Sequence, residues 1–435
     1  EKEFAFYGLI DHVFESVTTN NNSTGRSLCC NCSMKLSKLL SKDNLPNSQI
    51  LQNDPKVLEE LGEDRTNFFA LLRGSYTDPK TREQLSVWIG ASPEKPIKYI
   101  LKNAPATMYF KKYLNFDEND KNSLLYQKDI FDKNIIDLSF LKSDLIFNPS
   151  LSIYSGTVID YIHACLEPHF YEMFFETTTL SDGKTPVNRM TIRPKPFSYR
   201  ELDNEEKIQD GWTYWDDLDT IEFSSKYRIW QNLGVNDYEI SNFFQTVYVN
   251  SLTASPSSGL GLVGTQYPVM DFDLIKRYGL REHSSEVRFL NTKEVKGNFQ
   301  KYNKAYIESE GDGFFKSLLA KRDKQVEWFL FPAFESGQLT VLGNSAYKIG
   351  RKLLYTDRMY YDFENVFMDL EPVKGMEFYI SRVAHSYDFP GTYTTTLGLS
   401  RGQAVKKVNE KNAQYKSVIP DWYKKRKLYK VNRLA

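Results

Sequence analysis

The cysteines are the first residues of this chain whose types could do chemistry. Cys29, Cys30 and Cys32 lie within four residues of one another, and Cys165 is far along the chain. Neighbours this close rarely satisfy disulfide geometry with one another. Four thiols could in principle hold zinc, but the paired C-x2-C spacing of recognisable zinc sites is missing. We therefore expect small apolar fillers, no metal, and folding in a reducing compartment.

The histidines offer little for catalysis. The chain has five, at positions 12, 163, 169, 283 and 385. His385 has no serine or cysteine elbow near it in sequence, so a nucleophilic triad is unsupported. We expect its ring to bridge neighbouring strands by hydrogen bonding. His163 and His169 flank Cys165 at a spacing too loose to indicate a metal site. We therefore assign no catalytic, metal or cofactor-binding residues and expect no cofactor.

Two further segments resemble functional motifs. Residues 212–219 read Trp-Thr-Tyr-Trp-Asp-Asp-Leu-Asp, and aromatic platforms beside carboxylates are typical of carbohydrate sites and glycoside hydrolysis. A single such stretch is also common in ordinary loops. Residues 259–264 match the glycine spacing of a dinucleotide loop, but Pro268 interrupts any following helix and no clear βαβ unit surrounds it. The second segment is predicted to be a surface loop.

The elements that would position these residues are mostly strands. Period-two alternation, turn signals and aromatic-rich runs predict hairpins and short strands, and helical spacing appears in a few places. An Asp-Gly turn at 181–184 favours a hairpin. The expected strands are 4–18 with a turn at 18–25, 85–90, 167–176 with 188–197, 221–223, 243–249, 338–342 and 376–387 with 393–402; the expected helices are 28–40, 158–166 and 313–330.

Composition places the chain among large globular proteins. It has 435 residues, 41% of them hydrophobic and 14% aromatic, so we expect two to four structural units. The formal net charge is zero, which gives no global electrostatic argument for nucleic acid or an acidic surface. No apolar run approaches the roughly 20 residues that span a bilayer. The chain begins at Glu1, so we expect that its true start is missing.

The last predicted hairpin carries a family motif. Its first strand reads Val-x-His-x-Tyr, a turn with glycine follows, and a Thr-rich strand ends in Arg-Gly. Upstream lie a Tyr-Gly-x-Arg element, a helix at 314–330, and an aromatic hairpin that ends in an Arg-Pro-x-Pro-Phe corner. In this order the motifs resemble tail hub proteins of tailed bacteriophages and contractile injection systems, well over about 165–405 and loosely before 100. The matching residues are Pro168, Phe170, Tyr171, Glu172, Arg193, Pro194, Pro196, Phe197, Tyr278, Gly279, Leu280, Arg281, Val383, His385, Tyr387, Gly391, Thr394, Thr395, Thr396, Leu397, Arg401 and Gly402.

The resemblance implies a non-enzymatic structural protein of the virion tail, assembled in the host cytoplasm. It implies a homotrimeric ring that adapts the sixfold tail tube to a threefold tip or spike around a channel for genome passage. The implied partners are other copies of the chain, the tail tube protein and the tip or spike protein. The tape-measure protein in the lumen is a further candidate partner, and DNA would pass only transiently. Closed rings need wide, shape-matched subunit contacts, which suits strands with exposed aromatics.

The predicted fold class is α+β and β-dominated, with two tail-tube-like antiparallel β-barrel domains and α/β insertions. The first barrel is expected at 1–105 and a mixed α/β insertion with a hairpin at 106–220. The second barrel is expected at 221–255 and 331–405, interrupted by a helical insertion at 256–330. A basic segment at 406–435 follows, for which we expect docking on a tail partner; residues 401–435 hold eleven Lys or Arg and two acids.

Two other function classes stay open from the sequence alone. One is a tip-associated cell-wall (peptidoglycan) hydrolase that uses the acids at 212–222. The other is a secreted, β-rich binding protein. Paired carboxylates that face one cleft would favour the hydrolase, and a stable monomer in solution would favour the binding protein.

Overall fold

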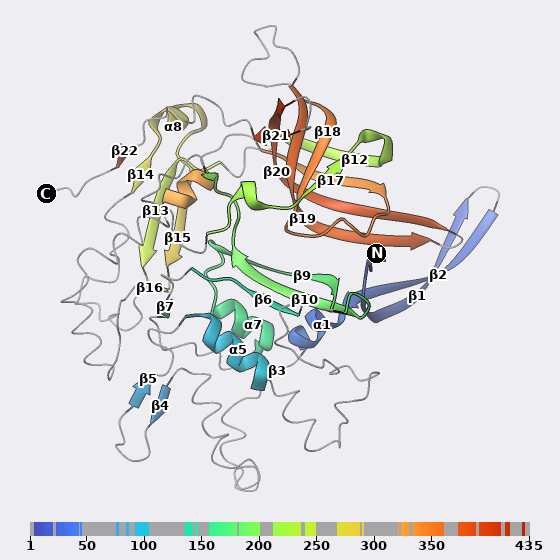
Figure 1. Cartoon of the computed structure of the whole chain (residues 1–435), viewed down its shortest axis with the longest axis horizontal. Helices are drawn as coiled ribbons and strands as arrows, with labels where there is room; N and C mark the ends of the chain where they lie inside the picture. Colours follow the sequence, from blue (N-terminus) through green and yellow to red (C-terminus); the bar gives the residue numbers. More distant parts are fainter. Residues whose placement is uncertain are drawn as a thin grey trace, which may run out of the picture. The chain divides into compact units, whose positions relative to one another are not determined.

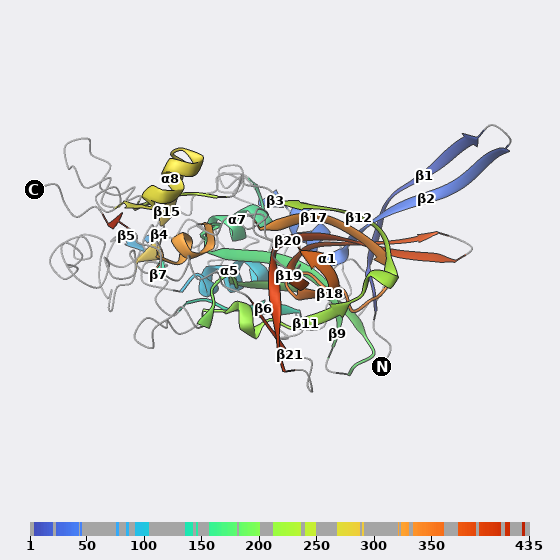
Figure 2. The ribbon, with the colours of Figure 1, turned by 90° about the horizontal axis from the view of Figure 1, so that it is seen from above.

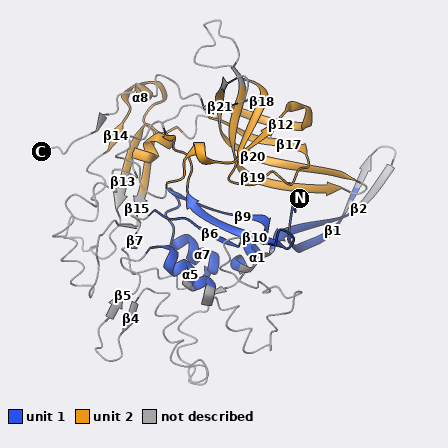
Figure 3. Ribbon diagram, viewed as in Figure 1, with its two compact units in different colours: residues 1–194, 288–317 blue, residues 195–287, 318–435 orange. Residues whose placement is uncertain are grey.

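The structure is a computed structural model of the whole chain, and its elements fall into two compact units. Unit 1 comprises residues 1–194 and 288–317, and unit 2 comprises residues 195–287 and 318–435 (Figure 3). The structure describes residues 4–20, 23–42, 44–45, 75–77, 84–86, 92–103, 135–141, 145–146, 156–180, 182–200, 212–235, 240–248, 268–287, 289–290, 321, 323–329, 334–360, 373–388, 391–409, 414–417 and 429–430.

Among its described residues, unit 1 combines a long hairpin, a small mixed sheet and three helices (Figure 1). In the mixed sheet, β10 pairs antiparallel with β9 and parallel with β6. Short two-stranded pairs complete it: β3 with β8, β4 with β5, and β7 with β16. Its elements are β1 Gly8–Asn20, β2 Ser23–Met34, α1 Lys35–Lys42, β3 Asn44–Leu45, β4 Ser75–Thr77, β5 Gln84–Ser86, α5 Glu94–Asn103, β6 Ile136–Leu138, β7 Leu145–Ile146, β8 Gly156–Thr157, α7 Val158–Ala164, β9 Tyr171–Thr179, β10 Pro186–Pro194 and β16 Phe289–Leu290.

Unit 2 is organised around one large sheet. Its strand order is β11-β18-β19-β20-β17-β12, antiparallel except for the parallel pair β11 and β18. Outside this order, β21 pairs antiparallel with β20. The sheet curls into a half-barrel (Figure 1). A second, smaller sheet has the order β15-β13-β14-β22. The elements are η3 Trp215–Asp217, β11 Thr220–Phe223, η4 Ser225–Tyr227, β12 Arg228–Val235, β13 Phe243–Tyr248, β14 Val269–Met270, α8 Phe272–Tyr278, β15 Glu282–Val287, helical residues 323–329, β17 Glu335–Leu342, β18 Lys352–Tyr360, β19 Val373–Asp388, β20 Thr392–Asn409, β21 Gln414–Ser417 and β22 Tyr429–Lys430.

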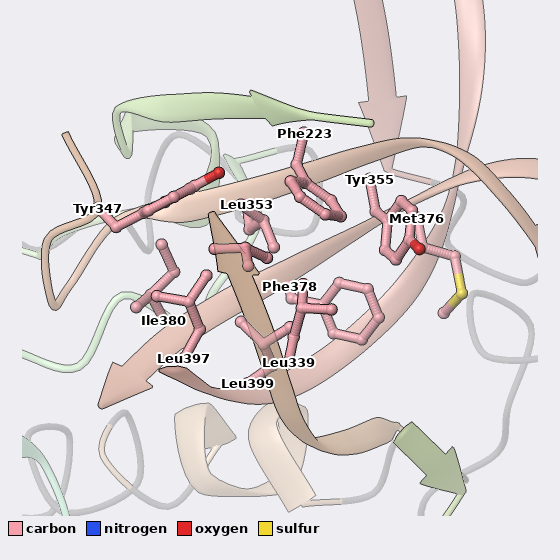
Figure 4. Close-up of a cluster of buried hydrophobic side chains, with 11 residues drawn as sticks. Phe223, Leu339, Tyr347, Leu353, Tyr355, Met376, Phe378, Ile380, Leu397 and Leu399 are labelled. Carbon is pink, nitrogen blue, oxygen red and sulfur yellow. The ribbon is translucent and has the colours of Figure 1, made fainter. Parts of the chain in front are cut away.

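The concave face of the large sheet holds one apolar core (Figure 4). Alternate residues of β17, such as Leu339 and Val341, are fully buried, while Gln338 and Leu342 on either side of them are exposed. Figure 4 shows side chains from β17, β18, β19 and β20 meeting in a single cluster. Each fully buried side chain of this size stabilises the fold by about 1.5–3 kcal/mol. The cluster consists of Phe223, Leu339, Val341, Tyr347, Leu353, Tyr355, Met376, Phe378, Ile380, Leu397 and Leu399.

A second core cluster joins the sheet to the rest of unit 2. Tyr379 points from β19 toward Tyr199, Trp215 and Phe334, together with residues of β13, α8 and the 323–329 helix. The two clusters lie on opposite faces of β19, because neighbouring residues of a strand point to opposite faces. Phe378 and Tyr379 illustrate this alternation directly. The central strands are thereby buried on both faces.

The expected β-dominated α+β class is confirmed, as are most of the predicted elements. The hairpins predicted at 167–176 with 188–197 and at 376–387 with 393–402, and the helix predicted at 158–166, are present as β9–β10, β19–β20 and α7. In the predicted 313–330 helix, residues 321 and 323–329 are helical and 313–320 lie outside the described residues. The predicted loop at 256–264 also lies outside them. The division into two barrels and the five predicted domain ranges stay a prediction.

The helix predicted at 28–40 is wrong in its first half. Residues up to Met34 belong to β2, and only Lys35–Lys42 are helical. Helical spacing of Leu28, Cys32 and Leu36 suggested one continuous helix. Pairing with β1 overrides that local pattern, because Leu28 lies opposite Glu15 and Cys32 opposite Ile10 in an antiparallel register. Among the described helices, none is long and apolar enough to cross a membrane.

Candidate interaction surface

The hairpin β19–β20 places its motif residues in two different environments. Val383 is half-buried against the apolar core, whereas Tyr387 near the tip is 67% exposed. Gly391 sits in the turn with a φ of 154°, a value that favours glycine. The inner end of the hairpin therefore builds the fold, and its outer end projects side chains into solvent.

His385 bridges the two strands of this hairpin, as predicted. Its Nδ1 lies 2.9 Å from the Thr395 hydroxyl and 3.1 Å from the Tyr393 hydroxyl, both on β20. Burial lowers the pKa of His385 below its ordinary value, and nearby Lys348 lowers it further. The neutral ring thus acts as a cross-strand hydrogen-bonding group, and its contacts are those of a structural residue.

Arg401 and Gly402 form a packed corner in which two distant motifs meet. Arg401 has a φ of 55°, and its guanidinium lies 4.3 Å from the ring centroids of both Phe197 and Phe334. It also donates from Nη2 to the Trp328 carbonyl at 3.1 Å. A Cβ at Gly402 would lie 2.3 Å from Phe378, so only glycine fits. The Arg-Gly pair in the middle of β20 and the Phe of the Arg-Pro-x-Pro-Phe corner therefore pack together.

The other family-like elements are also structural. Tyr278-Gly279-Leu280-Arg281 ends α8, with Gly279 at a φ of 76°. Asn242 fixes this end, since its Nδ2 donates to the Gly279 carbonyl at 2.7 Å and its Oδ1 accepts from the Arg281 N–H at 2.8 Å.

In unit 1, the matching aromatic hairpin is held by ion pairs across its strands. Glu172 of β9 accepts from Arg193 Nε of β10 at 2.7 Å. Arg189 of β10 is likewise paired with Glu176 of β9. Opposite charges directly across an antiparallel pair stabilise its register.

The aromatic and acidic run at 212–219 separates into a buried and an exposed part. Trp212, Tyr214 and Trp215 are buried, and Trp215 Nε1 donates to Glu377 Oε1 of β19 at 2.7 Å. Asp216 and Asp217 are exposed, and Asp217 accepts from Arg200 Nη2 at 2.6 Å. The aromatic rings therefore face the core, where they cannot form a platform for a sugar.

Glu377 is the centre of a buried polar network in unit 2. Besides Trp215, Gln403 Nε2 donates to its Oε1 at 3.1 Å, and the Tyr199 hydroxyl donates to Gln403. The Lys352 ammonium lies 3.8 Å from Glu377 Oε2 and supplies the compensating charge. Buried carboxylates are costly unless paired and hydrogen-bonded, and this one is both.

Three of the four cysteines lie on one strand, and the fourth lies at the end of a helix. Cys29, Cys30 and Cys32 follow one another along β2, whereas Cys165 caps the end of α7 in unit 1 and is fully buried. Burial raises the pKa of the Cys165 thiol, with a smaller opposite effect from Tyr161. Within the described residues, no group of three or more His, Cys, Asp or Glu is arranged to hold a metal ion.

The feature that sequence reasoning missed is the exposed edge of the large sheet. Strand β12 pairs with β17 on one side, and the described strands leave its other side open. Almost every residue of β12 is exposed or half-exposed, including Ile229 and Trp230, which are 51% and 49% exposed. The sequence offered only a weak indication of this edge, in the adjacent Ile229 and Trp230 that precede Gly234. We name the exposed apolar residues here the β12 surface: Tyr227, Ile229, Trp230, Val235 and Leu342.

An open edge with exposed aromatics is a typical protein-binding feature. Unpaired strand N–H and C=O groups accept an added strand, and proteins usually protect such edges with charges or cover. Trp and Tyr are enriched in protein interfaces, and Trp230 and Tyr227 supply both here. Lys226 and Arg228 lie at one end of this surface, together with the Asp357 carboxylate, which accepts from the Ser225 N–H at 2.9 Å.

Comparison with known proteins gives structural neighbours only. No protein-family model matches the chain, and no curated protein matches its sequence. Among similar solved structures is the 43 kDa tail protein of prophage MuSo2 from Shewanella oneidensis, with 10% identity and a TM-score of 0.36, covering 90% of this chain and 77% of that one. A tail protein from Neisseria meningitidis MC58 has 9% identity and a TM-score of 0.33 over 90% and 79%. The phage P2 baseplate matches at 7% identity and a TM-score of 0.20 over 90% and 79%. By their names these three are a prophage tail protein, a tail protein and a phage baseplate.

Proposed function

We propose that this chain is a structural, non-enzymatic tail hub protein of a tailed bacteriophage. The observation that carries the proposal is the corner in which Arg401 packs between Phe197 and Phe334. It joins two motifs of the hub resemblance that lie about 200 residues apart in sequence. Because short motifs recur by chance, their meeting in one packed centre is a stronger signal than either motif alone.

In this proposal three copies form a ring that joins the sixfold tail tube to a threefold tip or spike. The channel of the ring would pass the genome, and the tail tube, tip and tape-measure proteins would be its partners in the virion tail. The β12 surface would be part of the contact between copies. It supports the proposal because an open, apolar sheet edge of this kind aggregates unless another chain covers it.

The hydrolase alternative finds less support in the described part of the 212–222 run. Glycoside hydrolysis needs two carboxyl groups on either side of one scissile bond. Asp217 is paired with Arg200, and Asp219 lies 3.8 Å from Arg351. Asp216 also accepts from the Arg200 backbone N–H, at 3.2 Å. These acids are therefore engaged in fixing the segment that leads into β11.

The native mass of the purified chain tests the proposal. We expect a trimer by light scattering or native mass spectrometry, with rings in negative-stain images. Trp230→Lys should reduce the trimer fraction, because it places a charge in the β12 surface. Phe272→Lys is the matched control, since Phe272 of α8 is 42% exposed in unit 2, close to the 49% of Trp230, but lies outside that surface and outside the family motifs. A chain that stays monomeric, alone and with tail tube protein, would refute the proposal.

A further inference from the structure

The β1–β2 hairpin of unit 1 carries three of the four cysteines of the chain on one strand. Figure 2 shows its strands running side by side as one long ribbon, and among the described strands they pair only with each other. Cys30 and Cys32 are exposed, and Cys29 between Leu28 and Cys30 is half-buried. Cysteine is among the residue types most often buried, so two exposed thiols are not explained by packing.

Cys30 and Cys32 lie on the same face of β2 and contact each other. Residues two apart on a strand share a face, so Cys29 points to the other side. The register places Cys30 opposite Val13 and Cys32 opposite Ile10. A side-chain hydrogen bond joins the Cys32 thiol to the Cys30 sulfur. The two thiols therefore form one exposed pair, which we name the thiol pair.

The strand ladder is irregular directly beside the thiol pair. The register shifts between Ile10 and His12, which leaves Asp11 as an extra residue of β1 opposite this segment. A bulge of this kind bends the strand and increases its local twist. The Asp11 carboxylate is held at this place by an ion pair with Lys38. The hairpin therefore departs from a regular ladder where the two thiols lie.

The environment of the thiol pair favours the protonated form of one member. The pKa of the Cys32 thiol is raised above its ordinary value, first by desolvation and then by the hydrogen bond to Cys30. The negative charge of Asp11 adds to this effect. Because the thiolate is the nucleophile in disulfide exchange, Cys32 is a poor first nucleophile. We therefore assign the first attack on an oxidant to Cys30.

We propose that Cys30 and Cys32 are a thiol–disulfide exchange site, which a low-molecular-weight disulfide such as oxidised glutathione converts to a disulfide within the strand. The Cys30 thiolate attacks one sulfur of the oxidant, forms a mixed disulfide and releases one glutathione thiolate. The Cys32 sulfur then loses its proton and attacks the Cys30 sulfur, which releases the second glutathione thiolate. The two released thiolates take up the two protons. Two protein thiols are thus oxidised to one disulfide, and one oxidant molecule is reduced to two thiols. The inference goes beyond the proposed function and does not depend on it.

Closure of this bond has to bend β2 further. Two residues along a strand span about 6.6 Å at ~3.3 Å per residue, and parallel side chains keep their Cβ atoms about as far apart. A disulfide brings the two Cβ atoms to about 3.5–4.5 Å. The bond is therefore strained, and strained, exposed disulfides are easily reduced. We expect a reversible modification of the hairpin.

Mass spectrometry of the full chain tests this site. The reduced chain is incubated with oxidised glutathione without denaturant, the remaining thiols are blocked with N-ethylmaleimide, and the tryptic peptides are fragmented. We expect Cys30 linked to Cys32 and Cys29 blocked by the maleimide. Cys32→Ser removes the second nucleophile, so glutathione should remain on Cys30 several-fold more often than in the unmodified chain. Cys29→Ser is the matched control, because it removes a thiol from the opposite face of the same strand and should leave the linked pair unchanged.

Other patterns of oxidation overturn the proposal. Glutathione that stays on both Cys30 and Cys32 of the unmodified chain would show that the two thiols react separately. A link from Cys29 to Cys30, or disulfides between chains, would show that the thiol pair is not the reactive unit. Cys30→Ser should take up glutathione on Cys32 several-fold more slowly than Cys32→Ser does on Cys30, and equal rates would refute the order of attack. Excess reduced glutathione should reopen the bond, and a bond that persists would contradict the argument from strain.

Discussion

Replacement of Arg401 gives the sharpest test of the corner that joins the two motifs. Arg401→Ala removes two cation–π contacts at 4.3 Å, worth about 1.5 kcal/mol each when desolvated. It also removes the hydrogen bond to the Trp328 carbonyl, worth about 2 kcal/mol for a charged donor. Relief from burying the guanidinium offsets about 2 kcal/mol of this loss. We expect a net loss of about 3 kcal/mol in the free energy of unfolding of unit 2.

The backbone of Arg401 supplies a second variant with a different expected value. At a φ of 55° a Cβ costs about 1–2 kcal/mol, and glycine avoids this cost but loses about 0.5–1 kcal/mol to chain entropy. Arg401→Gly should therefore have a free energy of unfolding about 0.5–1 kcal/mol higher than that of Arg401→Ala, and it should unfold at a higher urea concentration. Arg382→Ala, an exposed arginine on the neighbouring strand, should change stability by less than about 0.5 kcal/mol.

Urea titration followed by tryptophan fluorescence measures these differences, since Trp212, Trp215 and Trp328 are all buried in unit 2. A loss below about 1 kcal/mol for Arg401→Ala would show that the corner is not a stabilising centre. A glycine variant less stable than the alanine variant would refute the argument from backbone conformation. In the first case Arg401 would contact Phe197 and Phe334 without stabilising unit 2.

Two further predictions concern the ends of the two hairpins. Asn188→Ala should weaken the attachment of the β1–β2 hairpin by about 1–3 kcal/mol, because it removes both side-chain hydrogen bonds to the backbone at the hairpin base. Faster amide exchange confined to residues 7–36 would confirm this, and unchanged exchange would contradict it. His385 has a pKa below its ordinary value of 6.5, so the unfolded chain takes up its proton first as the pH falls. The stability that neutral His385 contributes is therefore complete above pH 6.5 and is lost as the pH falls through the folded-state pKa. His385→Gln should lose less stability than the unmodified chain between pH 7 and pH 5 in urea titrations, and equal slopes would show that His385 does not cause the effect.

Local patterns in the sequence determined most of the elements around the corner formed by Arg401 and Gly402. The alternation in residues 376–387 and 393–402 and the turn at Gly391 were enough to predict the β19–β20 hairpin. Strand periodicity follows from the backbone and is readable without tertiary contacts. The role of His385 was also predicted from sequence: with no serine or cysteine elbow near it, its ring was expected to bridge strands by hydrogen bonding.

Only the tertiary structure decided the remaining points. Leu28 to Met34 have helical spacing, but pairing with β1 made them a strand, because local propensity is weak against a long-range ladder. The meeting of Phe197 with Arg401 depends on the path of the chain between them, which no spacing encodes. The exposure of Trp230 depends on which strand lies at the sheet edge, and strand order is a property of the whole sheet. Sequence thus determined the elements and the family resemblance, and tertiary packing determined which residues lie in a buried corner and which lie on an exposed sheet edge.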